Sequence, residues 1–271
     1  MTWVRGSVRF LLVTVGIIAV TSLGIDASQY LTGANSALGI LVDRATEGAC
    51  PEGMVFIETG TEDFCIDAFE ASPHSSCPIT DTTKSNDTTV NLLDTSCQPQ
   101  SVANVTPWRF VSLYEAQKLC ARAGKRLPTN AEWHRASLTL NDTTSCVVNK
   151  TGVARTGSAS CVSTDGVHDL VGNVWEWLDA SIENGSINGR TLPADGYVQT
   201  VDSNGVVVKT GLEPSLDMGA DYAWTDTEGS AAMIRGGFYS SGSDAGVFAQ
   251  NLTVAFNIRT DGIGFRCVQA I

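Results

Sequence analysis

From Cys50 onward, the hydrophobic positions form short runs that glycines, tryptophans and cysteines interrupt. Helical periodicity is rare in this part of the chain. The clearest exception is a segment in which Leu113, Ala116 and Leu119 recur at the spacing of one helix face. The pattern predicts a helix over residues 112–123, within a domain that is otherwise built from short strands and irregular chain.

Polar residues at the helix ends support this prediction and indicate a second helix. Ser112 is followed three residues later by Glu115, which makes a capping box, and Gly124 follows the last turn. Thr129 and Glu132 repeat the same pairing of a hydroxyl with a carboxylate. We therefore expect a second short helix to begin at Thr129.

The N-terminal segment is continuously apolar. Residues 10–25 carry no charge, Arg5 and Arg9 precede them, and Asp26 follows. The positive-inside rule then places the N-terminus in the cytoplasm and the rest of the chain outside. The stretch is intermediate in length between a signal-peptide core and a spanning helix, and no small-residue cleavage motif follows it. We favour an uncleaved anchor. The expected organisation is a membrane anchor or signal segment over residues 1–27, a helical stalk over residues 28–48 and a folded domain over residues 49–271.

A second interpretation of the N-terminus remains open. Gly6 after a short basic leader, followed by an apolar helix, resembles the leader of a type IV pilin. Leu11 departs from that pattern, because most bacterial pilins have glutamate there. In this interpretation the chain is a pilin-like or surface-filament subunit that carries the folded domain.

Charge and cysteine content limit the compartment and the partners. The net charge of −12 would repel a nucleic-acid phosphate backbone. The chain has eight cysteines and no Cys-x-x-Cys motif, and its three histidines, His74, His134 and His168, lack the spacing of paired metal ligands. We therefore predict disulfides and an extracytoplasmic or extracellular domain. The spacing by itself leaves the pairing open.

Four blocks of sequence point to a family. They cover residues 53–70, 115–133, 166–177 and 235–267; the third contains Gly172–Trp177, with its Gly-Asn-x-Trp-Glu motif, and the last opens with Arg235-Gly236-Gly237 and closes with Gly264-Phe265-Arg266-Cys267. In this order they resemble the formylglycine-generating enzymes, also called sulfatase-modifying factors. The resemblance implies an α+β fold of the C-type-lectin-like type, with small antiparallel sheets, two helices and much irregular chain.

The resemblance also suggests a disulfide pairing. Related lectin-like folds join the helix to the last strand, which here corresponds to Cys120 and Cys267. The proposed set is Cys120–Cys267, Cys146–Cys161, Cys50–Cys65 and Cys77–Cys97.

The family's chemistry requires residues that this chain lacks. Formylglycine-generating enzymes oxidise a cysteine of a sulfatase with a cysteine pair that binds copper shortly after the Arg-Gly-Gly motif. Residues 238–264 of this chain contain no cysteine. We therefore expect no copper and no oxidation, and an oxidase with a relocated active site remains as the alternative.

The same segment is a candidate binding surface. It mixes aromatic side chains, which supply stiff contact area, with small polar ones, which supply adaptable hydrogen bonds. It resembles the variable region of retroelement-diversified proteins, which end in a similar Gly-Phe-Arg block. The alternative is that the aromatics are core residues and the serines lie in turns. We expect a protein or glycan ligand, and the candidate residues are Phe238, Tyr239, Ser241, Asp244, Phe248, Gln250, Phe256, Asn257, Arg259 and Asp261.

A calcium ion is the one cofactor that the resemblance suggests. In the family, the Gly-Asn-x-Trp-Glu motif supplies oxygen ligands, which here correspond to Asn173, the carbonyl of Val174 and Glu176. Calcium prefers six to eight oxygens, so further ligands would be needed. The alternative is that Asn173 and Glu176 satisfy buried backbone groups.

Residues 179–232 form an insert whose sequence contains no motif that identifies a ligand. Several glycines mark turns, and Asn204-Gly205 before three valines predicts a hairpin. We expect this insert to shape the rim of the binding surface.

Overall fold

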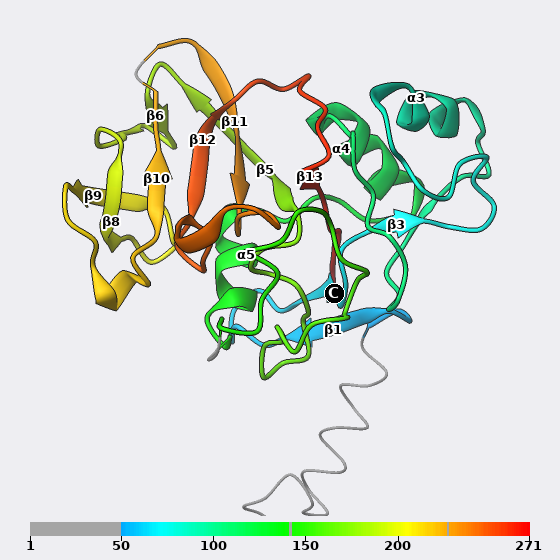
Figure 1. Ribbon diagram of the computed structural model, residues 1–271, viewed down its shortest axis with the longest axis horizontal. Helices are drawn as coiled ribbons and strands as arrows, with labels where there is room; N and C mark the ends of the chain where they lie inside the picture. The colour runs from blue at the N-terminus through cyan, green and yellow to red at the C-terminus, as the bar shows by residue number, and fades with distance from the viewer. Residues whose placement is uncertain (1–49, 141–142, 227) are drawn as a thin grey trace, which may run out of the picture. The chain divides into compact units, whose positions relative to one another are not determined.

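The computed structural model describes residues 50–140, 143–226 and 228–271 (Figure 1). The predicted anchor, stalk and pilin-like leader lie outside the described residues. Within the described ranges, no helix is long and apolar enough to cross a membrane.

Two helices form as the capping patterns predict. Helix α4 (Leu113–Arg122) begins after Ser112, whose Oγ accepts a hydrogen bond from the Glu115 backbone N–H. The Glu115 carboxylate in turn accepts from the Ser112 N–H at 3.0 Å. Helix α5 (Asn130–Ser137) begins in the same way, with Thr129 and Glu132 as the reciprocal pair. Both predictions are confirmed.

A third described helix, α3 (Ser85–Leu93), is not predicted by the hydrophobic pattern. Its buried face is polar, so apolar periodicity is absent. Asn91 exchanges two hydrogen bonds with the backbone of Ile79, at 2.9 and 2.8 Å. Thr88 donates to the Phe110 carbonyl and accepts from the Trp108 indole. These bonds to chain that is distant in sequence hold the helix in place.

The strands form one large sheet and two small ones, rather than the small antiparallel sheets that we expected. The large sheet has nine strands, and β10–β12 and β13–β5 are parallel pairs. Its order is β7 (Arg190–Thr191), β6 (Ser186–Ile187), β5 (Trp175–Glu183), β11 (Ser230–Arg235), β12 (Gln250–Val254), β10 (Tyr222–Trp224), β8 (Gly196–Val201) and β9 (Val207–Gly211), with β13 (Ile263–Gly264) beside β5. About half of the insert forms strands of this sheet, and β8–β9 is the predicted hairpin.

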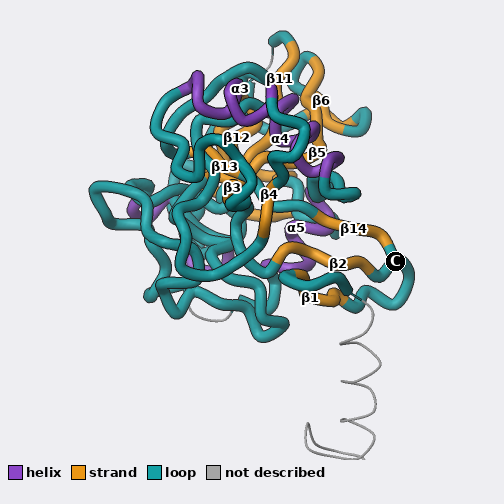
Figure 2. The backbone as a smooth tube through the Cα atoms, turned by 90° about the vertical axis from the view of Figure 1, so that its right-hand side faces the viewer, coloured by secondary structure: helices purple, strands orange, loops and turns teal. Residues whose placement is uncertain are grey.

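A three-stranded sheet joins the two ends of the folded domain. Strand β2 (Phe64–Asp67) pairs with β1 (Met54–Ile57) on one side and with β14 (Val268–Ala270) on the other. Figure 2 shows these strands together, with α5 next to them. The third sheet is the short pair β3 (Ser72–Pro73) and β4 (Pro99–Gln100), and two 3₁₀ turns, η1 (Leu216–Met218) and η2 (Gly242–Asp244), complete the elements.

Two hydrophobic clusters lie on opposite faces of the large sheet. Along β11, Ala231 and Met233 belong to one cluster, whereas Ala232 and Ile234 belong to the other. Because successive side chains of a strand point to opposite faces, the sheet separates the two clusters. The first also contains Trp133 of α5, and the second contains the apolar face of α4.

The structure contains disulfides Cys77–Cys97, Cys120–Cys267 and Cys146–Cys161, as the resemblance suggested. Cys50 and Cys65 are also disulfide-bonded, and none of the described cysteines is free.

Candidate functional site

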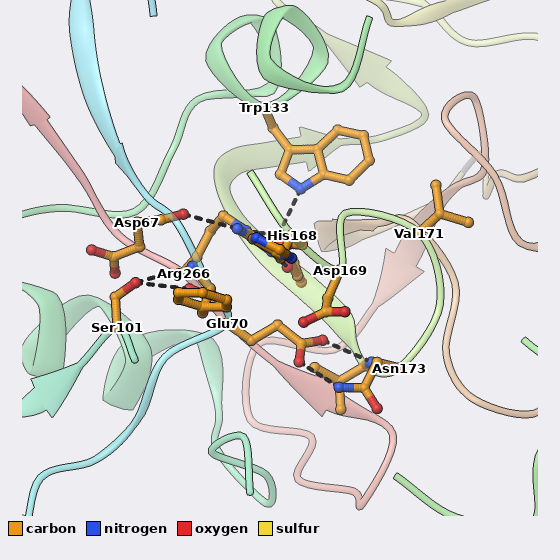
Figure 3. A network of polar contacts seen from close by, with 12 residues as sticks. Asp67, Glu70, Ser101, Trp133, His168, Asp169, Val171, Asn173 and Arg266 are labelled. Carbon is orange, nitrogen blue, oxygen red and sulfur yellow. Dashed lines mark hydrogen bonds and ion pairs between the residues drawn. The ribbon is translucent and has the colours of Figure 1, made fainter. Parts of the chain in front are cut away.

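Glu176 of the predicted calcium motif forms a buried ion pair with Arg266. Figure 3 shows Arg266 with its neighbours Glu70, Asp169 and Asn173. Arg266 and Glu176 have side-chain exposures of 0% and 1%. The Arg266 Nε lies 2.9 and 2.8 Å from the two Glu176 carboxylate oxygens, and its Nη2 lies 2.6 Å from Oε1. The Trp133 indole N–H donates to Glu176 Oε2 at 2.7 Å. Both carboxylate oxygens of Glu176 are therefore engaged.

Two further buried carboxyl groups lie near this pair. Glu70 accepts hydrogen bonds from the Asn173 side-chain amide at 2.5 Å and from the Val174 backbone N–H at 3.1 Å. Burial, with the neighbouring Asp169 and Glu176, raises the pKa of Glu70 well above its usual range. Burial also raises the pKa of Asp169 to about 6.

As arranged, the predicted ligands do not fit a calcium ion. Glu176 is neutralised by Arg266. The Asn173 side-chain oxygen accepts from the Ala154 backbone N–H at 2.8 Å, and its amide nitrogen is turned toward Glu70. Among the described residues, no group of three or more His, Cys, Asp or Glu side chains is placed to hold a metal. The motif instead ties β5 to the last strands and to the loop that carries Glu70.

Replacing Asp169 with asparagine is expected to change how stability depends on pH. The folded-state pKa of Asp169 is raised from 3.8 to about 6. The stability linked to its protonation is therefore present below pH 3.8 and is lost as the pH rises through 6. This loss corresponds to roughly 3 kcal/mol in the wild type. Asp169→Asn does not titrate, so its stability relative to the wild type should increase by that amount across the window, as measured by urea unfolding.

Asp94→Asn is the matched control, because the pKa of Asp94 is lowered in the folded state whereas that of Asp169 is raised. Hydrogen bonds from Ser96 lower the pKa of Asp94, so the aspartate stabilises the fold at neutral pH and this effect is lost in acid. The variant should lose stability relative to the wild type as the pH rises. If the free energy of unfolding depends on pH in the same way for Asp169→Asn and for the wild type, Asp169 titrates in the folded state as it does in the unfolded chain.

Four of the predicted binding residues come together at the surface, and we call them the Tyr239 face: Phe238, Tyr239, Ser241 and Asp261. The Tyr239 hydroxyl donates to Asp261 Oδ2 at 2.7 Å, and the rings of Phe238 and Tyr239 are 5.0 Å apart. Ser241 Oγ accepts from the Phe238 backbone N–H at 3.0 Å. The bond to Asp261 raises the pKa of Tyr239, so the phenol stays protonated as a donor.

A second group of predicted residues lies beside α4. Phe256 packs its ring 5.9 Å from that of Tyr114. Arg259 makes two hydrogen bonds to the Glu115 carboxylate, at 2.7 and 3.0 Å, so its guanidinium is already paired. Asn257, which lies between Phe256 and Arg259 in the sequence, is exposed.

The prediction is wrong for Gln250, whereas Phe248, like Phe238 and Phe256, is half-buried against a core cluster. Gln250 is fully buried in β12, where its amide accepts from the Val207 N–H and donates to the Gly205 carbonyl. Phe248 packs against the core cluster on the α5 face of the sheet. Gln250 opens β12, and the alternation of this strand turns its side chain inward. Asp244 is half-buried in η2.

A row of aromatic side chains, which the sequence interpretation missed, approaches the Tyr239 face across the large sheet. Successive ring distances are 5.3 Å for Tyr197–Tyr222, 4.9 Å for Tyr222–Trp224 and 5.8 Å for Trp224–Trp175. The Trp175 backbone N–H donates to the carbonyl of residue 262, which follows Asp261. The spacing of Tyr222 and Trp224, two residues apart in a short strand, was the available signal.

The histidines and cysteines of the described chain offer little reactive chemistry. His134 is buried, and desolvation lowers its pKa to about 4. His168 stacks on Phe69 with ring centroids 4.6 Å apart. All eight cysteines are in disulfides, so no thiolate is available to bind copper or attack a substrate.

Comparisons with known proteins support the family resemblance in the C-terminal half. Residues 141–271 match the model of the sulfatase-modifying factor enzyme 1-like domain. A search of curated proteins finds no significant match. The sequence blocks at 166–177 and 235–267 lie inside the matched region, and the two earlier blocks precede it.

Solved structures with a similar arrangement include three proteins. The Major Tropism Determinant U1 variant has a TM-score of 0.48 and 19% identity, over 82% of this chain and 53% of that one. PvdO from Pseudomonas aeruginosa has a TM-score of 0.44 and 14% identity, over 80% of this chain and 90% of that one. Treponema denticola variable protein 1 has a TM-score of 0.42 and 13% identity, over 81% of this chain and 99% of that one. This chain spans about half the length of the Major Tropism Determinant.

The matched region contains strands β5 to β14, the Arg266–Glu176 pair and the Tyr239 face, which are the elements that define the site. Over residues 141–271, this chain is similar to the sulfatase-modifying factor enzyme 1-like domain family.

Proposed function

We propose that this chain is a membrane-anchored, extracytoplasmic ligand-binding protein in which a sulfatase-modifying-factor-like scaffold binds a protein ligand and performs no oxidation. The absence of cysteine from residues 238–264 supports the non-catalytic part of this proposal. The engagement of all eight cysteines in disulfides supports an oxidising compartment. The apolar residues 10–25, with arginines before them, support the anchor.

The observation that carries the binding proposal is the construction of the Tyr239 face. Its loop is fixed from beneath, because the Tyr239 N–H donates to the Asn173 carbonyl at 2.9 Å and the Tyr239 carbonyl accepts from the Lys150 N–H at 2.7 Å. The face offers an aromatic ring whose hydroxyl donates to Asp261 and holds this exposed carboxylate in place beside it. Rigid tyrosines beside small polar groups are effective contacts in protein recognition, because little side-chain entropy is lost on binding.

Photo-crosslinking from the Tyr239 face tests this function and captures the ligand in the same experiment. A benzophenone amino acid at position 239 of the full chain, expressed in its own host, should yield a discrete crosslinked partner. The double variant with Asp261→Ala should lose most of that adduct, because the carboxylate contributes to the same contact. Mass spectrometry identifies the partner.

The same crosslinker at Val208 is the control position. Val208 is 46% exposed on β9 and is not among the residues of the Tyr239 face. An adduct from position 239 that is missing from position 208 is the expected result. Equal adducts from both positions, or none from position 239, would contradict a ligand at this face.

A further inference from the structure

A hollow of about 280 Å³ lies between the first turn of α4 and strand β5, with Phe256 on its rim. We call it the Tyr114 hollow. Its side chains belong to framework elements, because Tyr114 and Gln117 come from α4, while Asp179 and Ser181 come from β5. Positions held by a helix and a central strand keep a fixed geometry. The hollow is therefore preformed.

Tyr114 gives the hollow a flat apolar wall. Tyr114 is 61% exposed, although its ring is held at 5.9 Å from that of Phe256, with an angle of 33° between the planes. Phe256 packs against the core, and its carbonyl accepts from the Leu113 N–H at 3.1 Å. An exposed aromatic ring that is braced in this way presents its face to a ligand at little entropic cost.

The opposite wall is polar, and several of its hydrogen-bonding atoms are able to bind a ligand. Gln117 Nε2 donates to Asp179 Oδ1 at 3.2 Å, which leaves the second carboxylate oxygen and the Gln117 carbonyl able to accept. The Ser181 hydroxyl makes no hydrogen bond with any other described residue. The Asp179 backbone N–H donates to the Pro128 carbonyl at 2.8 Å and so fixes the strand at this point. Several hydrogen-bonding groups thus line one small volume.

The hollow continues into another one. A second hollow of about 280 Å³ shares residues Asp179, Ala180 and Ser181 with it. A third, of about 440 Å³, shares Thr129, Ala131 and Asn204 with the second. The first two hollows adjoin along Asp179–Ser181 and form a trough whose lining is rich in hydroxyl and amide groups. The third hollow is charged, because Glu62, Arg126, Glu132 and Arg135 line it, and it is not part of this trough. A trough of this form suits an extended ligand with repeating polar units.

The chemistry of the trough excludes other ligand classes. Among the described residues, no arginine, lysine or histidine lines the first two hollows, and Asp179 would repel an anion. A peptide strand would need a free backbone edge, but the Asp179 N–H is already bonded and β11 covers the other edge of β5. An apolar helix would bury the carboxylate and the amide without partners.

We propose that the Tyr114 hollow binds one ring of a neutral oligosaccharide, with a further ring in the second hollow. A sugar ring has an apolar face, which stacks on Tyr114, and a rim of hydroxyls, which hydrogen-bond Asp179, Gln117 and Ser181. The site uses none of the residues of the Tyr239 face, so it stands independently of the proposed protein ligand.

Titration with neutral oligosaccharides tests the site. The full-length chain is titrated with cellohexaose, maltohexaose and chitohexaose by calorimetry, and contacts are mapped by saturation-transfer NMR. We expect at least one of these oligosaccharides to bind with a dissociation constant in the millimolar range or below. Tyr114→Ala should weaken that binding at least about tenfold, whereas Tyr114→Phe, which keeps the ring, should retain it. Asp179→Ala should weaken it independently of the ring.

Controls separate this site from the Tyr239 face and from loss of folding. Tyr239→Ala should leave oligosaccharide affinity unchanged. Melting temperatures of the Tyr114 variants should match the wild type because the side chain is exposed. The proposal is overturned if none of the three oligosaccharides binds, if binding survives both Tyr114→Ala and Asp179→Ala, or if only an acidic oligosaccharide or a display-selected peptide competes for the trough.

Discussion

Replacing Arg266 with methionine is expected to lower the free energy of unfolding by about 3–5 kcal/mol at neutral pH, because it leaves buried charge without a partner. The guanidinium faces Glu176 directly and is near Glu70 and Asp169. Without it, these three buried carboxyl groups lose the guanidinium that neutralises Glu176 directly and lowers the charge repulsion among them. Since a domain is typically stable by about 5–15 kcal/mol, the variant should be close to unfolding at 37 °C. Urea unfolding followed by tryptophan fluorescence measures the change.

The loss should shrink in acid, which distinguishes the charge effect from a packing defect. The pKa of Asp169 is about 6 and that of Glu70 is raised well above its usual range, so both protonate under mildly acidic conditions. Neutral carboxyl groups no longer need the guanidinium. A loss of stability that is the same at neutral and at acidic pH would show instead that Arg266 acts mainly through packing.

Arg190→Met is the matched control for this charge. Arg190 pairs with Asp202 at 3.0 Å, and both side chains are about one-third exposed. Water screens such a pair, so its removal should cost less than about 1 kcal/mol. A similar cost for Arg190→Met and Arg266→Met would contradict the role given to burial.

Removal of the Cys120–Cys267 disulfide is expected to have the second large effect. The bond joins α4 to the C-terminal strands across a sequence separation of 147. The chain-entropy model predicts a loss of about 5 kcal/mol for a loop of this length, because the reduced unfolded chain gains more freedom. Cys120→Ala/Cys267→Ala should therefore unfold at much lower urea concentration than the wild type.

Cys146→Ala/Cys161→Ala provides the comparison. Its disulfide spans a separation of only 15, for which the same model predicts about 3 kcal/mol. The ordering of the two double variants is the decisive measurement. Equal losses would mean that the reduced, unfolded chain already keeps α4 close to the C-terminal segment.

Local patterns in the sequence were sufficient for α4 and α5. Their capping pairs, Ser112 with Glu115 and Thr129 with Glu132, act within three residues and do so in the structure. Helix α3 could not be found in this way. Its stability comes from side chains such as Asn91, whose partner Ile79 lies in a separate loop.

The candidate site was predicted in part. The segment that carries Tyr239 and Asp261 was identified from its composition, and the structure joins these two residues across 22 positions of sequence. The same composition also selected Gln250, because a polar side chain in a strand resembles a surface residue until its buried partners are known. Tyr114 was missed because its neighbours in the Tyr114 hollow come from β5 and from Phe256, far along the chain.

The sequence by itself determined the properties that depend on residue identity or on short spacing: the family resemblance of the C-terminal half, the helix caps, the negative charge and the absence of a cysteine pair after Arg235. The tertiary structure alone decided what each polar group faces. Glu176 is a calcium ligand or the partner of an arginine according to which side chain lies opposite it, and residue 266 is 90 positions away. Burial and long-range pairing set the chemistry of such groups, and no local pattern encodes either.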